Sequence, residues 1–427
     1  MRAKVKIVAI IMLLFSLQGT SQQLHNHQIN KLKLLDVYEL PHNLIYNNTT
    51  VGGLSGIDYD ASNDRYYMIC DDRSAINPAR YYTAKITINQ KQIDTIYFTG
   101  VDFLIDEKGQ LYPSNKQDPK RTPDPEALRY NPITQQMIWS SEGERIVNSK
   151  DTILSNPSLT IIQSYGKWVD SLTWPKMTVE VDNKLLLATD SIKTNQTSIN
   201  KKEEDATTTK HEIGKWIDTI SLPANLYMKA SLNGPRQNGV LEGLTFADNY
   251  KTLYTNVEEP LYEDGPKADL TPNKAFVRLY KFDVATKKNT AQYAYELDPV
   301  AYAPIIPGAF KVNGIPDLLD IGNNQLLVIE RSFSTGRLAC TIKLFKVKLK
   351  GATDITNNPS LLINKVFKPV KKQLLLNMDE LGVFTDNIEG VTFGPVLPNG
   401  HGTLVFVADN NFAAYQRSQF FLFEIIP

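Results

Sequence analysis

Carboxylates recur at one place in several short apolar segments of the chain. The aligned residues are Ser55 in GLSGIDYD, Glu126 in PEALRYNP, Glu242 in LEGLTFAD, Asp317 in IPDLLDIG and Glu389 in IEGVTFGP. Carboxylates that are forced together cannot all remain ionised unless a cation or an arginine lies among them. Several oxygen ligands on rigid elements suit a hard cation such as Ca²⁺. The pattern therefore indicates a candidate cation site or a site of acid–base chemistry.

Charged residues also follow the next apolar segment after these positions. Arg73 in CDDRS and Arg331 in IERSF are the candidate arginines of a polar ring. The acidic residues at these ends are Asp71, Asp72, Glu258, Glu259 and Glu330. They are either cation ligands or solvated charges, and residues 409–411, DNN, are compatible with a turn or with a ligand set.

A structural role for the repeated carboxylates stays open. Each one can accept backbone N–H groups of a neighbouring repeat, or pair with an arginine, and so fix how the repeats pack. In that interpretation Gly243 and Gly390, which directly follow Glu242 and Glu389, relieve crowding between strands.

Several reaction classes are disfavoured by what the sequence lacks. None of its five histidines pairs with another at the spacing of zinc ligands. No G-x-S-x-G elbow and no Walker loop occurs. If the protein is a hydrolase, we therefore expect metal-assisted attack of water on a phosphoester. Carboxylates would serve as ligands and general base, and arginines would bind phosphate oxygens.

The apolar segments predict an all-β fold. They are short, rich in Tyr, Phe, Val, Ile and Thr, and bounded by Asn, Asp, Gly or Pro. After each aligned residue follow a second and a third strand-like segment, and in places a fourth. This repeat is typical of the four-stranded blades of a β-propeller.

The spacing of the repeats is nearly regular except for a longer gap between Glu126 and Glu242. In that gap GKWVDSLTWP (166–175) recurs as GKWIDTISLP (214–223), which indicates a local duplication. The polar stretch 191–212 between the copies is predicted to be a disordered loop. We expect five blades, or six if the insertion recruits neighbouring strands.

The last repeat ends one strand short of a blade. KLKLLDVYEL (31–40) can supply the missing strand, so that the N-terminal strand closes the last blade and leaves no open edge. Residues 31–427 are accordingly predicted to be a single propeller domain.

The N-terminal 21 residues have the layout of a signal peptide, with basic residues, a short apolar run and then small residues. That run is too short to span a bilayer, so we expect a protein exported to the periplasm or secreted. Its 46 basic and 46 acidic residues balance, which argues against nucleic acid as a partner. Cys70 and Cys340 lie in apolar segments and are predicted to be buried free thiols.

The order of the motifs resembles the exported bacterial phytase-like proteins described as having esterase-like activity of phytase. The resemblance runs from about Gly53 to Ile426 and is carried by GLSGIDYD with DDRS, DPEALRY, NGVLEGLTF with LYTNVEEPL, IPDLL with LLVIERSF, and NIEGVTF with LVFVADNNF. The chain departs from the pattern at Ser55 and Asp317, where glutamates would complete the ring. The insertion between 176 and 213 has no counterpart in it.

The resemblance implies an exported phosphoesterase-like hydrolase, phytase-like or phosphodiesterase-like, that uses channel carboxylates and a divalent cation, Ca²⁺. The candidate catalytic residues are Glu126, Glu242, Glu389, Arg73 and Arg331. The candidate metal ligands are Asp72, Glu242, Glu258, Asp317, Glu330, Glu389 and Asp409. The alternatives are a propeller that binds a ligand or partner without catalysis, through rim residues such as Tyr262 or Tyr295, and a hydrolase of lactones or carboxylic esters.

Overall fold

The computed structural model describes residues 28–89, 91–163, 168–169 and 211–427. The predicted signal peptide and residues 191–210 of the predicted loop lie outside this part of the chain. The last two residues of that predicted loop belong instead to a strand, β14 (His211–Ile213). No helix in the described ranges is long and apolar enough to cross a membrane.

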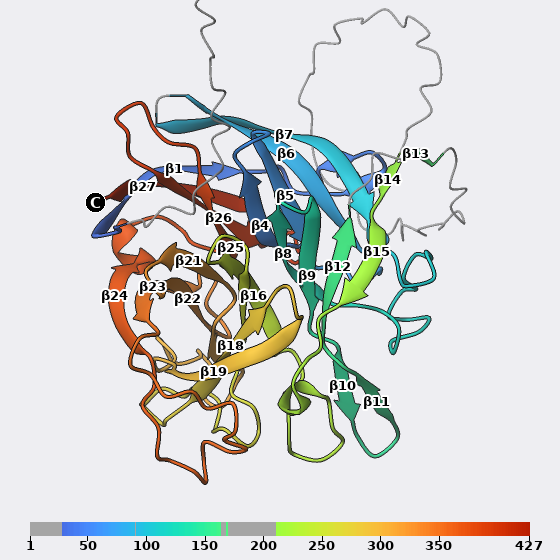
Figure 1. Cartoon of the computed structure of the whole chain (residues 1–427). Helices are drawn as coiled ribbons and strands as arrows, with labels where there is room; N and C mark the ends of the chain where they lie inside the picture. The colour runs from blue at the N-terminus through green and yellow to red at the C-terminus, as the bar shows by residue number, and fades with distance from the viewer. Residues whose placement is uncertain (1–27, 90, 164–167, 170–210) are drawn as a thin grey trace, which may run out of the picture.

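The described strands form five antiparallel blades around a central axis (Figure 1). Each innermost strand contacts the innermost strands of the two neighbouring blades, and the last contacts the first, so the ring is closed. These strands are buried along most of their length because other blades flank them. The all-β class and the count of five blades are confirmed, and the six-blade alternative is wrong.

The first four blades each follow the chain from the axis outward. Blade 1 consists of β4 (Leu54–Asp60), β5 (Arg65–Cys70), β6 (Arg80–Asn89) and β7 (Gln92–Phe103). Blade 2 consists of β8 (Pro125–Asn131), β9 (Gln136–Ser141), β12 (Ser158–Gln163) and β15 (Lys215–Thr219). Blade 3 consists of β16 (Leu241–Ala247), β17 (Thr252–Val257), β18 (Phe276–Asp283) and β19 (Lys288–Glu296). Blade 4 consists of β21 (Leu318–Gly322), β22 (Gln325–Ser334), β23 (Thr341–Lys348) and β24 (Lys371–Asn377).

The fifth blade joins the two ends of the described chain. It consists of β25 (Asn387–Gly394), β26 (Thr403–Asp409), β27 (Gln419–Ile426) and β1 (Lys31–Glu39). β1 pairs antiparallel with β27, from Lys31 opposite Ile426 to Glu39 opposite Gln419. The predicted closure by the N-terminal strand is confirmed.

Several shorter elements lie outside the four main strands of each blade. β20 (Lys311–Gly314) extends blade 4 by pairing with β22, and β14 pairs in parallel with β7 and carries β13 (Trp168–Val169). β10 (Glu144–Val147) and β11 (Thr152–Ser155) form a hairpin that projects from blade 2 (Figure 1). The remaining elements are the hairpin of β2 (Ile45–Tyr46) and β3 (Thr49–Thr50) and two 3₁₀ helices, η1 (Ala224–Leu226) and η2 (Met378–Leu381).

The core lies between the blades, where apolar faces of neighbouring sheets pack together. One cluster joins blades 1 and 5 through residues such as Ile57 and Val407, and others join the remaining neighbours. Cys70 and Cys340 are buried and free, as predicted. Tyr295, predicted at the rim, is instead fully buried.

Candidate functional site

The five aligned residues lie at the same β-bulge in each blade. The register between the first two strands shifts by one residue there in blades 1, 2, 3 and 5, and the same shift separates β20 from β21 in blade 4. Such bulges redirect side chains and are common beside functional sites. Gly243 follows the bulge residue of blade 3, and a Cβ on it would lie 2.8 Å from the Cα of Asp317. The predicted relief of crowding at this glycine is confirmed.

Two of the aligned side chains brace the ring. The Ser55 hydroxyl donates a hydrogen bond to the carbonyl oxygen of Glu126 in blade 2 (2.6 Å). Asp317 accepts the backbone N–H of Val391 in blade 5 (2.9 Å) and forms an ion pair with Arg129 in blade 2 (2.7 Å). Burial raises the pKa of Asp317 to about 6, and Arg129 opposes that shift. The structure therefore places this candidate ligand in a paired position within the ring.

Arg129 ties the innermost strands of all five blades together. From β8 its guanidinium donates to the carbonyl oxygens of Ile57 in blade 1, Leu244 in blade 3 and Val391 in blade 5. Its ion pair with Asp317 reaches blade 4. This buried arginine is the central fastener of the propeller.

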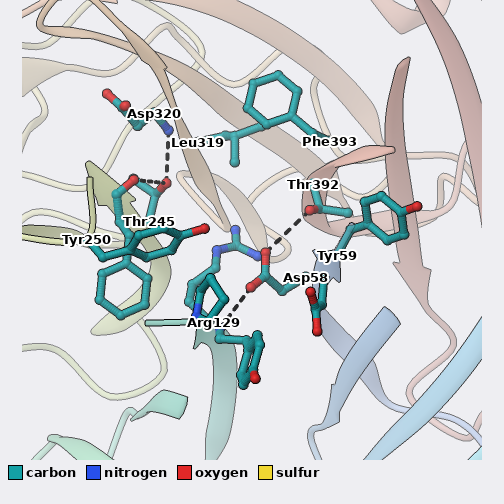
Figure 2. Close-up of a pocket in the computed structure, with 13 residues that line it drawn as sticks. Asp58, Tyr59, Arg129, Thr245, Tyr250, Leu319, Asp320, Thr392 and Phe393 are labelled. Carbon is teal, nitrogen blue, oxygen red and sulfur yellow. Dashed lines mark hydrogen bonds between the residues drawn. The ribbon is translucent and has the colours of Figure 1, made fainter. Parts of the chain in front are cut away.

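Polar side chains surround Arg129 at one end of the channel (Figure 2). They stand three residues after the aligned set: Asp58, Thr245, Asp320 and Thr392. The Thr392 hydroxyl donates to Asp58 (3.4 Å), and the Thr245 hydroxyl accepts the Asp320 N–H (2.9 Å). The pocket that these residues line has a volume of about 50 Å³, which holds a few water molecules but no organic substrate.

A much larger cavity, of about 770 Å³, lies at the opposite end of the channel. Glu126 and Glu242 face it from their bulges, together with Glu142, which directly follows β9. One carboxylate oxygen of each lies within 4.8 Å of the others. Glu142 accepts the backbone N–H of Val240 (2.5 Å) and also hydrogen-bonds to the Glu242 carboxyl group. Two carboxyl groups in such contact must share a proton or a cation.

Asp71 and Asp124 extend this cluster toward blade 1. Carboxylate oxygens of Asp71, Asp124 and Glu126 lie within 4.8 Å of one another, and the two aspartates hydrogen-bond together. The predicted Arg73 forms ion pairs with Glu144 and with Asp124 (3.5 Å). Its buried Nε–H has no hydrogen-bond partner among the residues that the structure describes.

Arg331 and Glu389 bring blades 3, 4 and 5 into the same cavity. Arg331 forms ion pairs with Glu258 (2.6 Å) and Glu389 (2.5 Å) and donates to Asn387. The Nε–H of Arg331, Oε2 of Glu389 and Oδ2 of Asp409 are buried, and within the described chain they have no hydrogen-bond partner. The structure thus gathers most of the predicted site residues around one cavity.

Two further candidate ligands, besides Asp317, lie apart from this cavity. Asp72 forms an ion pair with buried Arg80 (2.7 Å) and accepts the N–H groups of residues 75–77. Glu330 accepts hydrogen bonds from the Tyr295 hydroxyl and the Lys372 ammonium group, both at 2.6 Å. The carboxylates of Asp72 and Glu330 thus already pair with neighbouring side chains, outside the cavity.

Burial and mutual repulsion raise the pKa values of the cavity carboxyls. Burial raises the pKa of Glu142 to about 8, and a neighbouring aspartate adds to the shift. Burial and then nearby carboxylates raise the pKa values of Glu126 and Glu242 well above the usual range. The pKa values of Asp71 and Asp409 rise for the same reasons. These shifts favour the protonated carboxyl groups, and a cation that binds them would displace the protons.

The donor set fits a hard divalent cation. The carboxyl groups that line the cavity and form no ion pair within the described ranges are Asp71, Glu126, Glu142, Glu242 and Asp386. Buried oxygens without partners remain at Glu389 and Asp409. Clustered carboxylate oxygens on rigid strands are the ligands that Ca²⁺ prefers. Glu126, Glu142 and Glu242 are the residues best placed to hold it.

Asp124, Glu142 and Arg129 were not selected from the sequence as site residues. Glu142 directly follows the second strand of its blade, as Glu258 does, so the repeat contained a signal for it. Asp124 stands two residues before Glu126 in a quoted motif. The role of Arg129 depends on partners in four other blades, three carbonyl oxygens and the Asp317 carboxylate, which no single repeat displays.

The sequence of the chain matches the model of one known protein family. A family model described as "Phytase-like: Esterase-like activity of phytase" matches residues 49–201 and 206–412. No curated protein sequence matches the chain at a significant level.

Two solved structures illustrate how distant the structural likenesses are. The periplasmic gluconolactonase of Pseudomonas aeruginosa is 8% identical with a TM-score of 0.35, over 88% of this chain and 87% of that one. An α-L-arabinofuranosidase from Lactobacillus brevis is 11% identical with a TM-score of 0.39, over 87% of this chain and 91% of that one. At such low scores these two alignments carry no argument about activity.

Proposed function

The chain belongs to the phytase-like family described by esterase-like activity of phytase, and from this premise we propose that it is an exported hydrolase of phosphoric esters. Its reaction would take place in the carboxylate cavity with the help of a divalent cation, Ca²⁺. The observation that carries the proposal is the convergence of buried carboxyl groups without basic partners in one open cavity, while their counterparts in blades 1 and 4 are used as braces.

The cation would be held by Glu126, Glu142 and Glu242, with Asp71 and Asp124 adjoining. When bound, it would neutralise these carboxylates and polarise a phosphoryl oxygen. The protein supplies the rigidity, because Glu126 and Glu242 stand on bulges of innermost strands that Arg129 fixes in place. Ligands held in this way need little reorganisation when charge develops in the transition state.

Arg331 supplies a hydrogen-bond donor for the phosphate, whereas Arg73 has a positioning role. Arg73 and Arg331 each keep a buried Nε–H without a partner in the described part of the chain. Buried donors that lack partners are rare, and an anionic ligand in the cavity explains the one on Arg331. Arg331 lines the cavity directly, whereas Arg73 lies behind Asp124 and is placed to orient that carboxylate.

The carboxyl pair Glu142 and Glu242 supplies proton transfer. Their hydrogen bond and raised pKa values keep a proton available near neutral pH. In the reaction, water adds to phosphorus, the bond from phosphorus to the leaving oxygen breaks, and the proton released by water passes through the carboxyl pair to the leaving oxygen. No other atom or electron is required.

The proposal is tested with purified mature protein and a panel of substrates. The panel contains bis(4-nitrophenyl) phosphate, 4-nitrophenyl phosphate and 4-nitrophenyl acetate, each assayed with Ca²⁺ and with a chelator. We expect chelator-sensitive hydrolysis of a phosphoester, lost in Glu242→Gln and retained in Glu39→Gln, an exposed control on β1. Hydrolysis of the acetate alone would favour a carboxylic esterase. A folded protein inactive on every substrate would favour a binding propeller.

A further inference from the structure

One side of the carboxylate cavity carries an apolar surface. Phe310, Val312, Phe333 and Leu338 of blade 4 and Tyr415 of blade 5 line the same cavity as the glutamates. We call these five residues the apolar rim. Phe310 is 59% exposed and Leu338 is 74% exposed, although both are large apolar side chains. Exposed apolar groups that border a polar cavity are typical of ligand-binding surfaces.

The apolar rim is held in place by ordered backbone. The Thr335 N–H donates to the carbonyl oxygen of Phe310 (2.9 Å), and the Ile305 N–H donates to that of Thr335 (3.0 Å). The rings of Phe310 and Phe333 pack with centroids 6.3 Å apart. Because its backbone is fixed by these bonds, Phe310 is presented to the cavity and not folded into the core. The surface is therefore formed before any ligand arrives.

The charges of the cavity limit the number of phosphates that it can accept. The basic side chains among its described lining residues are Lys267, Arg331 and Arg337. Lys267 already pairs with Glu259, and Arg331 pairs with two glutamates. A bound cation would offset part of the carboxylate charge, but a substrate with many phosphate groups would still meet too few free bases.

These two observations define a substrate class, and the inference deepens the proposed function on which it rests. We propose that the substrate is a phosphodiester with a single negative charge and an apolar substituent, whose phosphate lies at the carboxylates and whose apolar group lies on the apolar rim. Hydrolysis adds water to phosphorus and breaks one ester bond. The products are an alcohol and a phosphomonoester that retains the other substituent.

The test compares two substrates that differ only in the apolar group. Methyl 4-nitrophenyl phosphate and octyl 4-nitrophenyl phosphate have the same charge and the same leaving group. We expect kcat/KM for the octyl ester to exceed that for the methyl ester about tenfold or more, since each methylene placed on an apolar surface contributes up to about fourfold. Both are assayed below the concentration at which the octyl ester forms micelles.

Variants assign the preference to the apolar rim. Phe310→Ser and Leu338→Ser alter exposed side chains, so their folding is checked by circular dichroism and thermal melting. Each should move the octyl-to-methyl ratio toward one. Val366→Ser, at a position that is 98% exposed and outside the cavity lining, is the matched control and should keep the wild-type ratio.

The outcomes separate this inference from the proposed function. Equal kcat/KM for both esters, or a preference that survives both rim substitutions, overturns the inference while the hydrolase stands. Hydrolysis of neither ester in the presence of Ca²⁺ also overturns the inference. The proposed function itself is overturned only if 4-nitrophenyl phosphate and bis(4-nitrophenyl) phosphate are not hydrolysed either. A dialkyl phosphodiester lipid in vesicles, assayed in parallel, distinguishes a bilayer source from a free amphiphile. Hydrolysis in either form, lost with the rim variants, supports the class.

Discussion

Blades 1 and 4 differ from blades 2, 3 and 5 in the contacts that the residue at the shared bulge makes. At the shared bulge, Ser55 and Asp317 bond to neighbouring blades, and Asp317 also pairs with Arg129. Glu126, Glu242 and Glu389 stand at the same bulge but face the cavity. A single repeated backbone feature thus provides structural contacts in two blades and chemical groups in three.

The difference shows how a propeller can hold unpaired acids at its axis. A charged group buried without a partner is costly, and several of them close together are more so. The Arg129 network at the other end of the channel supplies bonds to all five blades, which secures the ring against that repulsion.

The largest effect is expected at Arg129. Arg129→Met leaves Asp317 buried without its partner and leaves three carbonyl oxygens without donors, which should lower the free energy of unfolding by about 4 kcal/mol or more. Urea denaturation followed by tryptophan fluorescence measures it. Arg129→Lys keeps the charge but cannot reach every acceptor, so it should be intermediate. An unchanged midpoint for Arg129→Met would refute the role of Arg129 as fastener.

Glu242 and Ser55 occupy equivalent positions and should give opposite results. Glu242→Gln should lower kcat about 100-fold or more because it removes a ligand and a proton-transfer group, with no loss of stability. Ser55→Ala should keep activity but lower the free energy of unfolding by about 1 kcal/mol, because it removes one buried hydrogen bond. Steady-state kinetics and denaturation of both variants provide the check. Equal loss of activity in the two would contradict the division between structural contacts and chemical groups.

Asp71 and Asp72 are neighbours in sequence with different surroundings. Asp72→Asn breaks a buried ion pair with Arg80 and should cost about 3 kcal/mol of stability while Ca²⁺ affinity is unchanged. Asp71→Asn should weaken Ca²⁺ binding about tenfold, as expected for an adjoining group, with little change in stability. Thermal melts and calcium titrations distinguish them. The reverse pattern would place the cation site at Asp72.

The stability of the folded protein should fall as the pH rises from 5 to 8. The folded-state pKa of Glu142 is raised from 4.5 to about 8, so the folded protein keeps a proton that the unfolded chain releases. That contribution to stability is present below 4.5 and is lost as pH rises toward 8. In chelator, the melting temperature should fall by several degrees between pH 5 and pH 8, and less in Glu142→Gln or with Ca²⁺. A melting temperature that rises across this range would be inconsistent with buried, protonated carboxyls.

The fold could be predicted because its signal is local and repeated. Each blade begins with a recognisable segment, so alignment of five copies located the innermost strands and showed that the last blade lacked a strand, which β1 supplies. The insertion after β12 does not follow the blade repeat, so the sequence indicated only a local duplication and a loop there. His211 and Glu212 were predicted to lie in a loop but belong to β14, because Glu212 pairs with Asp102 on β7, a partner far away in the chain that the local sequence does not indicate.

The sequence could predict which positions belong to the site, but not which partners their side chains have. The alignment identified Glu126, Glu242 and Glu389, but their contrast with Asp317 depends on Arg129, which stands in another blade. The choice between Asp71 and Asp72 depended on where β5 ends, since one residue of difference turns a side chain to the opposite side. Partners across blades are set by three-dimensional packing, which the pattern of one strand does not encode.

The central claim is that the unpaired carboxyls of blades 2 and 3 exist to hold a cation. Isothermal titration of Ca²⁺ into chelator-treated protein at pH 7, repeated in buffers with different ionisation enthalpies, tests it most directly. We predict saturable binding accompanied by proton release, with both effects strongly reduced in Glu242→Gln. Absence of binding to a folded wild-type protein, or binding that Glu242→Gln leaves unchanged, would contradict the claim.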